Sequence, residues 1–196
     1  MGRLTIADPD DVDLTNLQRQ ILYRTDSVGT PKVEAARAAL SALNPDVKIF
    51  TLQKRIDANE LQSLLADVDV VLDCSDNFAT RHALNRACVE LRKPLVSGAA
   101  IRFDAQVAVF DLRKSDAPCY ACLFPEDGET EEVQCSTMGV FAPLTGIVGA
   151  LQAMEAAKLL TAAGETLNGR LLLLDAKRSE WRTVRVKKDP ACRICS

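Results

Sequence analysis

Residues 69–100, DVVLDCSDNFATRHALNRACVELRKPLVSGAA, decide the fold of this chain. They begin with a short, nearly continuous apolar strand that ends in the polar cluster DCSDN (73–77). A helix over 81–93 follows, and PLVSGAA (94–100) is typical of another apolar strand. A strand, a helix and a strand in succession form a βαβ unit, because parallel neighbours need a crossover connection. This stretch therefore predicts a parallel sheet covered by helices.

The same alternation precedes this stretch. Apolar periodicity and turn residues predict two strands, over 4–7 and 47–52, and three helices, over 14–22, 31–43 and 57–68. Thr30 is the expected N-cap of the second helix, and Pro31 stands at its first position, where its missing N–H does no harm. Strands and helices therefore also alternate over residues 4–68.

The pattern changes after residue 100. A longer strand is predicted over 105–112, and a loop rich in cysteines and acids follows, over about 115–138. One long apolar helix is predicted from about 140 to 163, and two strands joined by the turn KRS (177–179) indicate a hairpin. The expected fold class is α/β, with a Rossmann-like, mainly parallel sheet, helices on both faces, and antiparallel strands that continue it.

Composition excludes several classes of protein. The chain has 196 residues, 47% of them hydrophobic, and a net charge of −3, so it predicts one domain with no electrostatic case for nucleic acid or an anionic membrane. No apolar run approaches the ~20 residues of a membrane span, and no signal peptide leads the chain, which favours a cytoplasmic protein. Seven cysteines, an odd number, argue against a disulfide framework.

Polar residues follow the predicted parallel strands, where ligands bind in open sheets of this kind. Asp8 ends the first strand, and the DCSDN cluster (73–77) ends the buried one. The residues between them that suit a nucleotide are Asn16, Arg19, Gln20 and Lys32. A carboxylate can hold Mg²⁺, while Arg and Lys neutralise phosphate charge. Each residue alone is better explained as a cap, a turn residue or a solvated charge, so the combination carries the prediction.

The order and spacing of five segments resemble the ThiF/MoeB/HesA family. The segments are DPDDVDLTNLQRQILY (8–23), GTPKVEAARAALSALNP (29–45), VVLDCSDN (70–77), PLVSGAAI (94–101) and GALQAMEAAKLL (149–160). Members of this family are adenylyltransferases of ubiquitin-like sulfur-carrier proteins in thiamine or molybdopterin (molybdenum cofactor) biosynthesis. The resemblance covers essentially all of the chain, and SEWRTV (179–184) slightly favours the thiamine-type branch.

The resemblance implies a role for each polar residue. Asp8 is implied to hold the ATP ribose, and Asp76 to coordinate Mg²⁺. The residues implied to contact the phosphates, or to support those contacts, are Asn16, Arg19, Gln20 and Lys32. The implied reaction is attack by a carrier's C-terminal glycine carboxylate on the α-phosphate, which releases pyrophosphate and leaves an acyl-adenylate.

A carboxylate nucleophile needs no general base, so catalysis in this reaction rests on positioning and charge neutralisation. The implied catalytic side chains are therefore Arg19, Lys32 and Asp76. The single histidine, His82, lies in a predicted helix and is expected to be a surface or capping residue. Two alternatives stand beside the adenylyltransferase: a non-catalytic module that binds a carrier protein or dimerises, and an unrelated nicotinamide-dependent oxidoreductase that shares the sheet.

Two C-x-x-C pairs, Cys119 with Cys122 and Cys192 with Cys195, can each chelate one edge of a metal ion. Together they predict a tetrahedral four-sulfur Zn²⁺ site, although their long separation leaves a redox pair or unpaired thiols as alternatives. The resemblance implies the same zinc site, which clips the C-terminal tail to the domain. Four thiolates leave no open coordination position, so the role of the zinc is expected to be structural.

Cys135 lies in an acid-rich loop, and the resemblance to the thiamine branch implies that it accepts the activated carrier or its sulfur covalently. The neighbouring acids argue against unaided reactivity, because they raise the pKa of a thiol. The same loop is implied to cross the carrier's tail. Further implied partners are a second copy of the chain and a sulfurtransferase or cysteine desulfurase. Cys74 and Cys88 are expected to be inert core residues.

The expected domain organisation is a single ThiF-type adenylation domain over 1–196 that lacks the family's first strand, glycine-rich turn and helix. That turn would supply backbone N–H groups to the triphosphate. One hypothesis is that Met1 marks a misassigned start and that the native chain is longer. The competing hypothesis is that the short chain is genuine and binds ATP poorly.

Overall fold

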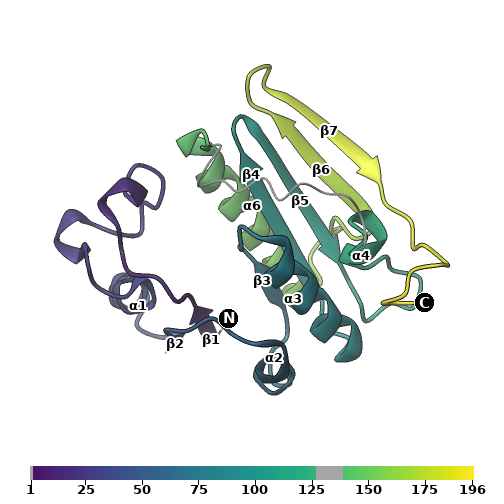
Figure 1. Cartoon of the computed structure of the whole chain (residues 1–196), viewed down its shortest axis with the longest axis horizontal. Helices are drawn as coiled ribbons and strands as arrows, with labels where there is room; N and C mark the ends of the chain where they lie inside the picture. The colour runs from purple at the N-terminus through teal and green to yellow at the C-terminus, as the bar shows by residue number, and fades with distance from the viewer. Residues whose placement is uncertain (1, 127–138) are drawn as a thin grey trace. The chain divides into compact units, whose positions relative to one another are not determined.

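The computed structural model describes residues 2–126 and 139–196. The chain divides into two compact units, Met1–Asp57 and Ala58–Ser196, and each has its own sheet (Figure 1). Within the described residues, no helix is long and apolar enough to cross a membrane.

The first unit is built on two parallel strands. Its elements are β1 (Arg3–Ala7), the 3-10 turns η1 (Leu14–Asn16) and η2 (Thr25–Ser27), α1 (Lys32–Leu43) and β2 (Lys48–Leu52). β1 pairs with β2 in parallel register, and α1 contacts β2. The apolar spacing predicts a buried face of Val33, Ala36, Leu40 and Leu43; Val33 and Ala36 are fully buried, but Leu43, at the end of the helix, is 78% exposed.

Two local predictions for this unit are wrong. The helix expected over 14–22 is only the turn η1, because Leu14 and Ile21 are 63% and 89% exposed and no buried apolar face supports a longer helix. Thr30 does not cap α1: its hydroxyl donates to the Ser27 carbonyl, and the N-cap position belongs to Pro31.

The second unit is a five-stranded mixed sheet with helices. Its elements are α2 (Ala58–Leu65), β3 (Val71–Asp73), α3 (Phe78–Glu90), β4 (Leu95–Ile101), β5 (Asp104–Phe110), α4 (Tyr120–Leu123), α6 (Ala142–Thr161), β6 (Arg170–Asp175) and β7 (Glu180–Arg185). The strand order is β3-β4-β5-β6-β7. β3 and β4 are parallel, and the remaining neighbours are antiparallel. The predicted α/β class, βαβ unit and final hairpin are confirmed.

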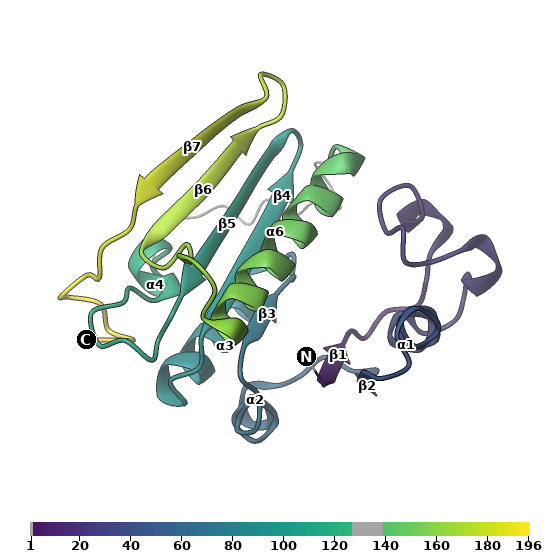
Figure 2. The same ribbon diagram turned by 180° about the vertical axis from the view of Figure 1, so that it is seen from behind.

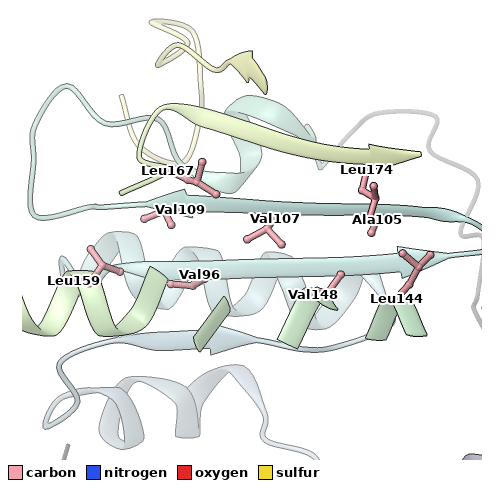
Figure 3. Close-up of a cluster of buried hydrophobic side chains, with 9 residues drawn as sticks. All are labelled: Val96, Ala105, Val107, Val109, Leu144, Val148, Leu159, Leu167 and Leu174. Carbon is pink, nitrogen blue, oxygen red and sulfur yellow. The ribbon is translucent and has the colours of Figure 1, made fainter. Parts of the chain in front are cut away.

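Helices lie on both faces of this sheet. Figures 1 and 2 show α6 against one face of β4 and β5, and α3 on the other face. The core between the sheet and α6 consists of nine apolar side chains (Figure 3): Val96, Ala105, Val107, Val109, Leu144, Val148, Leu159, Leu167 and Leu174. This core holds α6 against β4, the strand that pairs with β3.

α6 approaches the backbone of β4 most closely at Gly98. A Cβ added there would lie 2.4 Å from Gln152 Cδ and 2.7 Å from Val148 Cγ1, so this position admits only glycine without a shift of the helix. The close approach brings the Gln152 amide to the carbonyls of Asp73, at the end of β3, and of Val96, near the start of β4.

Candidate functional site

Asp8 directly follows β1, as the sequence predicts. Its carboxylate accepts a hydrogen bond from the Asp10 backbone N–H at 2.9 Å, and its own N–H donates to the Leu52 carbonyl at 3.2 Å. The side chain thus closes a turn at the carboxyl end of the strand. Burial and the Asp8 carboxylate together raise the pKa of Tyr23, which places that ring close to Asp8.

Lys32 is the most enclosed of the predicted phosphate ligands. Its side chain is 9% exposed, and its Nζ lies 2.9 Å from Asp10 Oδ2, a carboxylate that is 64% exposed. The Lys32 backbone N–H also donates to the Asp10 carbonyl. A ligand phosphate would therefore have to share this ammonium with Asp10.

Asn16, Arg19 and Gln20 lie on the turns after β1. The Gln20 backbone N–H donates to the Asn16 carbonyl at 2.9 Å, and Arg19 Nη1 donates to the Thr15 carbonyl at 3.4 Å. The Gln20 side-chain oxygen is buried, and no group in the described part of the chain hydrogen-bonds to it. The five residues predicted to hold the nucleotide are thus all in the first unit, held mainly by contacts close in sequence.

The turn after β3 holds the predicted magnesium ligand. Asp73 is buried and uses both carboxylate oxygens: Oδ1 accepts from the Ser75 N–H and hydroxyl, and Oδ2 accepts from the Ser97 hydroxyl. Asp76 is exposed, and its carboxylate accepts only a long bond, at 3.3 Å, from Asn77 Nδ2 among the hydrogen bonds found in the described residues. Of the two carboxylates in the turn, Asp76 is the one available to a ligand.

Sequence reasoning missed the residues that hold this turn. Gln152 Nε2 donates to the Asp73 carbonyl at 2.7 Å and to the Val96 carbonyl at 3.3 Å. Arg81 Nη2 donates to the Ser75 carbonyl at 2.7 Å. Arg81 lies in a predicted helix, four residues after the turn, so its side chain can reach back to the turn. Nothing in the sequence near Gln152 indicates that it contacts the turn.

The four cysteines of the C-x-x-C pairs meet in the second unit, where the C-terminal tail returns to α4 (Figure 1). Cys119 Sγ lies 3.7 Å from Cys192 Sγ and 3.9 Å from Cys122 Sγ. Cys122 Sγ lies 3.5 Å from Cys195 Sγ, and all four sulfurs lie within 4.8 Å of one another. A disulfide needs about 2.05 Å, whereas Zn–S bonds of about 2.3 Å in a tetrahedron separate sulfurs by about 3.8 Å. The four-cysteine cluster can therefore hold a metal ion.

Backbone and side-chain N–H groups surround the cluster. Asn85 Nδ2 lies 3.6 Å from Cys119 Sγ, and the Asp189 N–H lies 3.4 Å from Cys122 Sγ. Burial raises the pKa of Cys119 to about 11, which keeps its thiol protonated until a cation binds. At Cys192, burial is outweighed by the N–H groups of Ile194 and Cys195, and the pKa is lowered. Such donors favour the thiolates that a metal requires.

Three other predictions concern single residues. Cys88 is fully buried, as expected, but Cys74 is exposed, because it follows the buried Asp73 on the opposite side of the chain. His82 is not a surface residue: its side chain is 12% exposed and its ring packs against Phe78 and Tyr120. Burial lowers its pKa, so it is neutral near pH 7. Cys135 lies outside the described residues.

The fold and the candidate site together define a class of protein. It is an α/β protein with polar turns at the carboxyl ends of parallel strands and a separate four-cysteine cluster that can hold a metal ion. The model of the ThiF family matches residues 1–194, and the chain belongs to this family. The resemblance found in the sequence is thereby confirmed.

The relatives are named adenylyltransferases. The chain is 44% identical over 195 residues to the molybdopterin-synthase adenylyltransferase of Escherichia coli K12, covering 100% of this chain and 78% of the relative. It is 43% identical over 195 residues to the sulfur carrier protein ThiS adenylyltransferase of the same organism, covering 100% and 76%. These nearly equal identities do not favour either branch of the family.

Among solved structures, that of E. coli MccB with ATP shares the fold. Its TM-score is 0.85 at 21% sequence identity. The match covers 100% of this chain and 59% of the MccB chain, so this chain spans a little over half the length of that protein.

Proposed function

We propose that this protein uses ATP to adenylylate the C-terminal glycine carboxylate of a ubiquitin-like sulfur-carrier protein, for thiamine or molybdopterin cofactor biosynthesis. One observation carries the proposal: two curated adenylyltransferases match the full length of the chain at 44% and 43% identity. In the reaction, a carboxylate oxygen of the carrier bonds to the α-phosphorus, and the bond from that phosphorus to the β-phosphate oxygen breaks. The products are an acyl-adenylate and pyrophosphate.

The side chains of both units have roles in this proposal. Asp8 accepts hydrogen bonds from the ribose, and Lys32 and Arg19 neutralise the charge of the phosphates. Asn16 and Gln20 add polar contacts; the Gln20 side-chain oxygen, which has no partner among the described residues, accepts only and so suits a hydroxyl or amine donor of the ligand. No side chain need act as a base, since the attacking carboxylate is already ionised at neutral pH.

Asp76 is proposed to bind Mg²⁺. Its exposed carboxylate fits a hard cation that prefers oxygen ligands, whereas both carboxylate oxygens of Asp73 already accept hydrogen bonds, from Ser75 of the turn and from Ser97 of β4. Bound Mg²⁺ would offset the negative charge on the phosphates and leave the attacking carboxylate less strongly repelled.

The four-cysteine cluster is proposed to bind Zn²⁺ as a structural ion. Three of the separations between its sulfurs, 3.5 to 3.9 Å, fit the edge of a ZnS₄ tetrahedron, and all four sulfurs lie within 4.8 Å of one another. Four protein ligands leave no position for substrate, so the ion would hold the C-terminal tail against α4 and take no part in the reaction.

Cys135 stays a prediction: it would carry the activated carrier, or its sulfur, as a covalent intermediate. A sulfurtransferase or cysteine desulfurase would then supply the sulfur. If so, Cys135→Ser keeps ATP–pyrophosphate exchange but loses the carrier–enzyme adduct seen by mass spectrometry without reductant. An adduct that persists in the variant would contradict the role.

A homodimer is also proposed. α6 exposes a series of small residues, and Met154 on the same helix is 48% exposed, which suits close packing against a second copy. The small residues are Gly146, Gly149, Ala150 and Ala153. Light scattering after size exclusion should give about 43 kDa, twice the 21.3 kDa of the chain, and a mass of one chain at micromolar concentration would contradict the dimer.

The test of the proposed activity is ATP–pyrophosphate exchange with a purified carrier ending in Gly-Gly. Asp76→Asn should lower the exchange rate by on the order of 10²-fold, the usual loss when one stabilising group is removed. Asp116→Asn, which changes an exposed carboxylate elsewhere in the second unit, is the matched control and should retain the wild-type rate. Carrier binding without any exchange would favour the non-catalytic module instead.

A further inference from the structure

α3 connects the turn that carries Asp76 with the four-cysteine cluster. The helix begins immediately after the turn, where the Asn77 side chain accepts a hydrogen bond from the Thr80 N–H at 2.8 Å. It contacts β3 and also α4, the short helix that starts after Cys119 (Figure 1). The two features therefore share one rigid element.

Arg81 is the contact between α3 and the turn. Its side chain is 11% exposed, and its Nη2 donates to the Ser75 carbonyl at 2.7 Å. Its Nε lies 3.8 Å from Asp73 Oδ2, so the cation also faces the buried carboxylate around which the turn is folded. Any displacement of α3 at this residue is passed to the backbone next to Asp76.

Asn85 is the contact between α3 and the cluster. The residue is fully buried, and its Nδ2 points to Cys119 Sγ at 3.6 Å. Its Oδ1 accepts the Tyr120 backbone N–H at 2.9 Å. One amide thus holds both a metal-ligand sulfur and the first residue of α4.

The two contacts lie on the same face of the helix, because Arg81 and Asn85 are four residues apart. Tyr120, which follows Cys119, is buried, and its ring lies 5.4 Å from that of His82, also on α3. The tyrosine hydroxyl and Arg81 Nε are both buried and have no hydrogen-bond partner within the described residues. Asn85, ring packing and, just after α4, the ion pair of Arg86 with Glu126 therefore fix the distance between α4 and α3.

We infer that metal binding to the four-cysteine cluster sets the position of the Asp76 turn, with Asn85 and Arg81 as positioning residues on one face of α3. When the sulfurs have no metal, the Cys119 knuckle loses its metal link to the C-terminal tail, and α4 is held to α3 by Asn85, ring packing and the Arg86–Glu126 pair. α3 is then less restrained, and the turn opens locally more often. The significance of Asp76 rests on the proposed function, but the coupling itself does not.

Hydrogen exchange measured by mass spectrometry tests the coupling directly. The chain is compared when loaded with Zn²⁺, when stripped by a chelator, and when reloaded. The amides of Ser75 and Thr80 should exchange about tenfold faster in the stripped chain, which corresponds to a local opening easier by about 1.4 kcal/mol. Reloading should restore the slow rate. The amide of Val107, in the middle of the sheet, should not change.

The inference is overturned if stripping speeds exchange only over residues 115–123 and 189–196, while the amides of Ser75 and Thr80 keep their rates. It is also overturned if Val107 speeds up equally, because the metal would then support the whole sheet without a specific route.

Variants separate the two positioning residues. Arg81→Gln should keep one Zn²⁺ per chain, and its Ser75 amide should exchange fast whether or not metal is bound. Glu90→Gln changes an exposed residue of the same helix that contacts Gln62 of α2 and should keep the wild-type dependence on metal. Asn85→Asp should weaken Zn²⁺ binding by about 10- to 100-fold in competition with a chelator, as for other residues that support metal ligands.

These results are independent of the activity. If Arg81→Gln retains the full dependence of Ser75 exchange on zinc, or Asn85→Asp binds zinc normally, the coupling is contradicted. Absence of ATP–pyrophosphate exchange in a chain that shows the coupling would contradict the proposed function alone.

Discussion

The two units hold their polar residues in different ways. In the first, the side chains of Asp8, Asn16 and Arg19 bond to residues one to four positions away, although the pair of Lys32 and Asp10 spans 22 positions. In the second, Asp73 bonds to Ser97, and Gln152 bonds to Asp73 across 79 positions of sequence. Local contacts form a turn in any fold, whereas the long-range ones exist only when the sheet and α6 are packed. The second turn is therefore the one whose geometry depends on the whole unit.

The comparison predicts that damage to the second unit costs far more stability than damage to the first. The largest effect is expected at the cluster. Cys192→Ser should abolish stoichiometric zinc and lower the melting temperature by on the order of 10 °C, because metal binding contributes to folding directly. Metal analysis and thermal unfolding measure this. Cys74→Ser, at a cysteine outside the cluster, is the control for metal binding and should keep stoichiometric zinc.

The next largest effect on stability is expected at the two carboxylates of the turn after β3, Asp73 and Asp76. Asp73→Ala should lower the free energy of unfolding by about 3–5 kcal/mol, because it leaves Arg81 nearly buried without its counter-ion. Asp76→Ala should change it by less than about 0.5 kcal/mol, since that side chain is exposed. Urea denaturation of both variants gives the comparison. Equal losses would mean that Asp73 is not the residue around which the turn is built.

A smaller loss is expected where α6 meets β4. Gly98→Ala should cost about 1–3 kcal/mol of stability, because its methyl group would overlap Gln152 and Val148. Gly146→Ala, where an added Cβ meets no atom of the same chain within 4 Å, should instead stabilise the dissociated monomer by about 0.5–1 kcal/mol through helix propensity. The two denaturant midpoints should move in opposite directions. A common direction would contradict the close approach at Gly98.

The smallest stability effect is expected in the first unit. Lys32→Met should change the free energy of unfolding by less than about 1 kcal/mol, because its partner Asp10 is 64% exposed and water screens the pair. The same variant should lower ATP–pyrophosphate exchange by about 10²-fold if Lys32 binds phosphate. Lys48→Met, at an exposed lysine of β2, is the control and should leave the exchange rate unchanged. A large stability loss without a loss of exchange would reverse the assignment.

Much of the fold followed from periodicity. The βαβ unit over 69–100, the long helix now seen as α6 and the final hairpin were all indicated by apolar spacing and turn residues. The helix expected over 14–22 failed because spacing alone does not supply a surface to pack on, and Ile21 is 89% exposed. Helices of this length need tertiary contacts to form.

The sequence by itself determined the class of fold, the family, and which cysteines can bind a metal. These depend on residue types and spacings, which any chain displays before it folds. Only the tertiary structure decided that the Asp73 carboxylate is already hydrogen-bonded, to Ser75 and Ser97, while that of Asp76 is available to a ligand. It also decided that the four sulfurs lie within 4.8 Å of one another. It alone placed Arg81 and Asn85 between the turn and the cluster. The physical reason is that contacts between distant residues arise from packing, which no local pattern specifies.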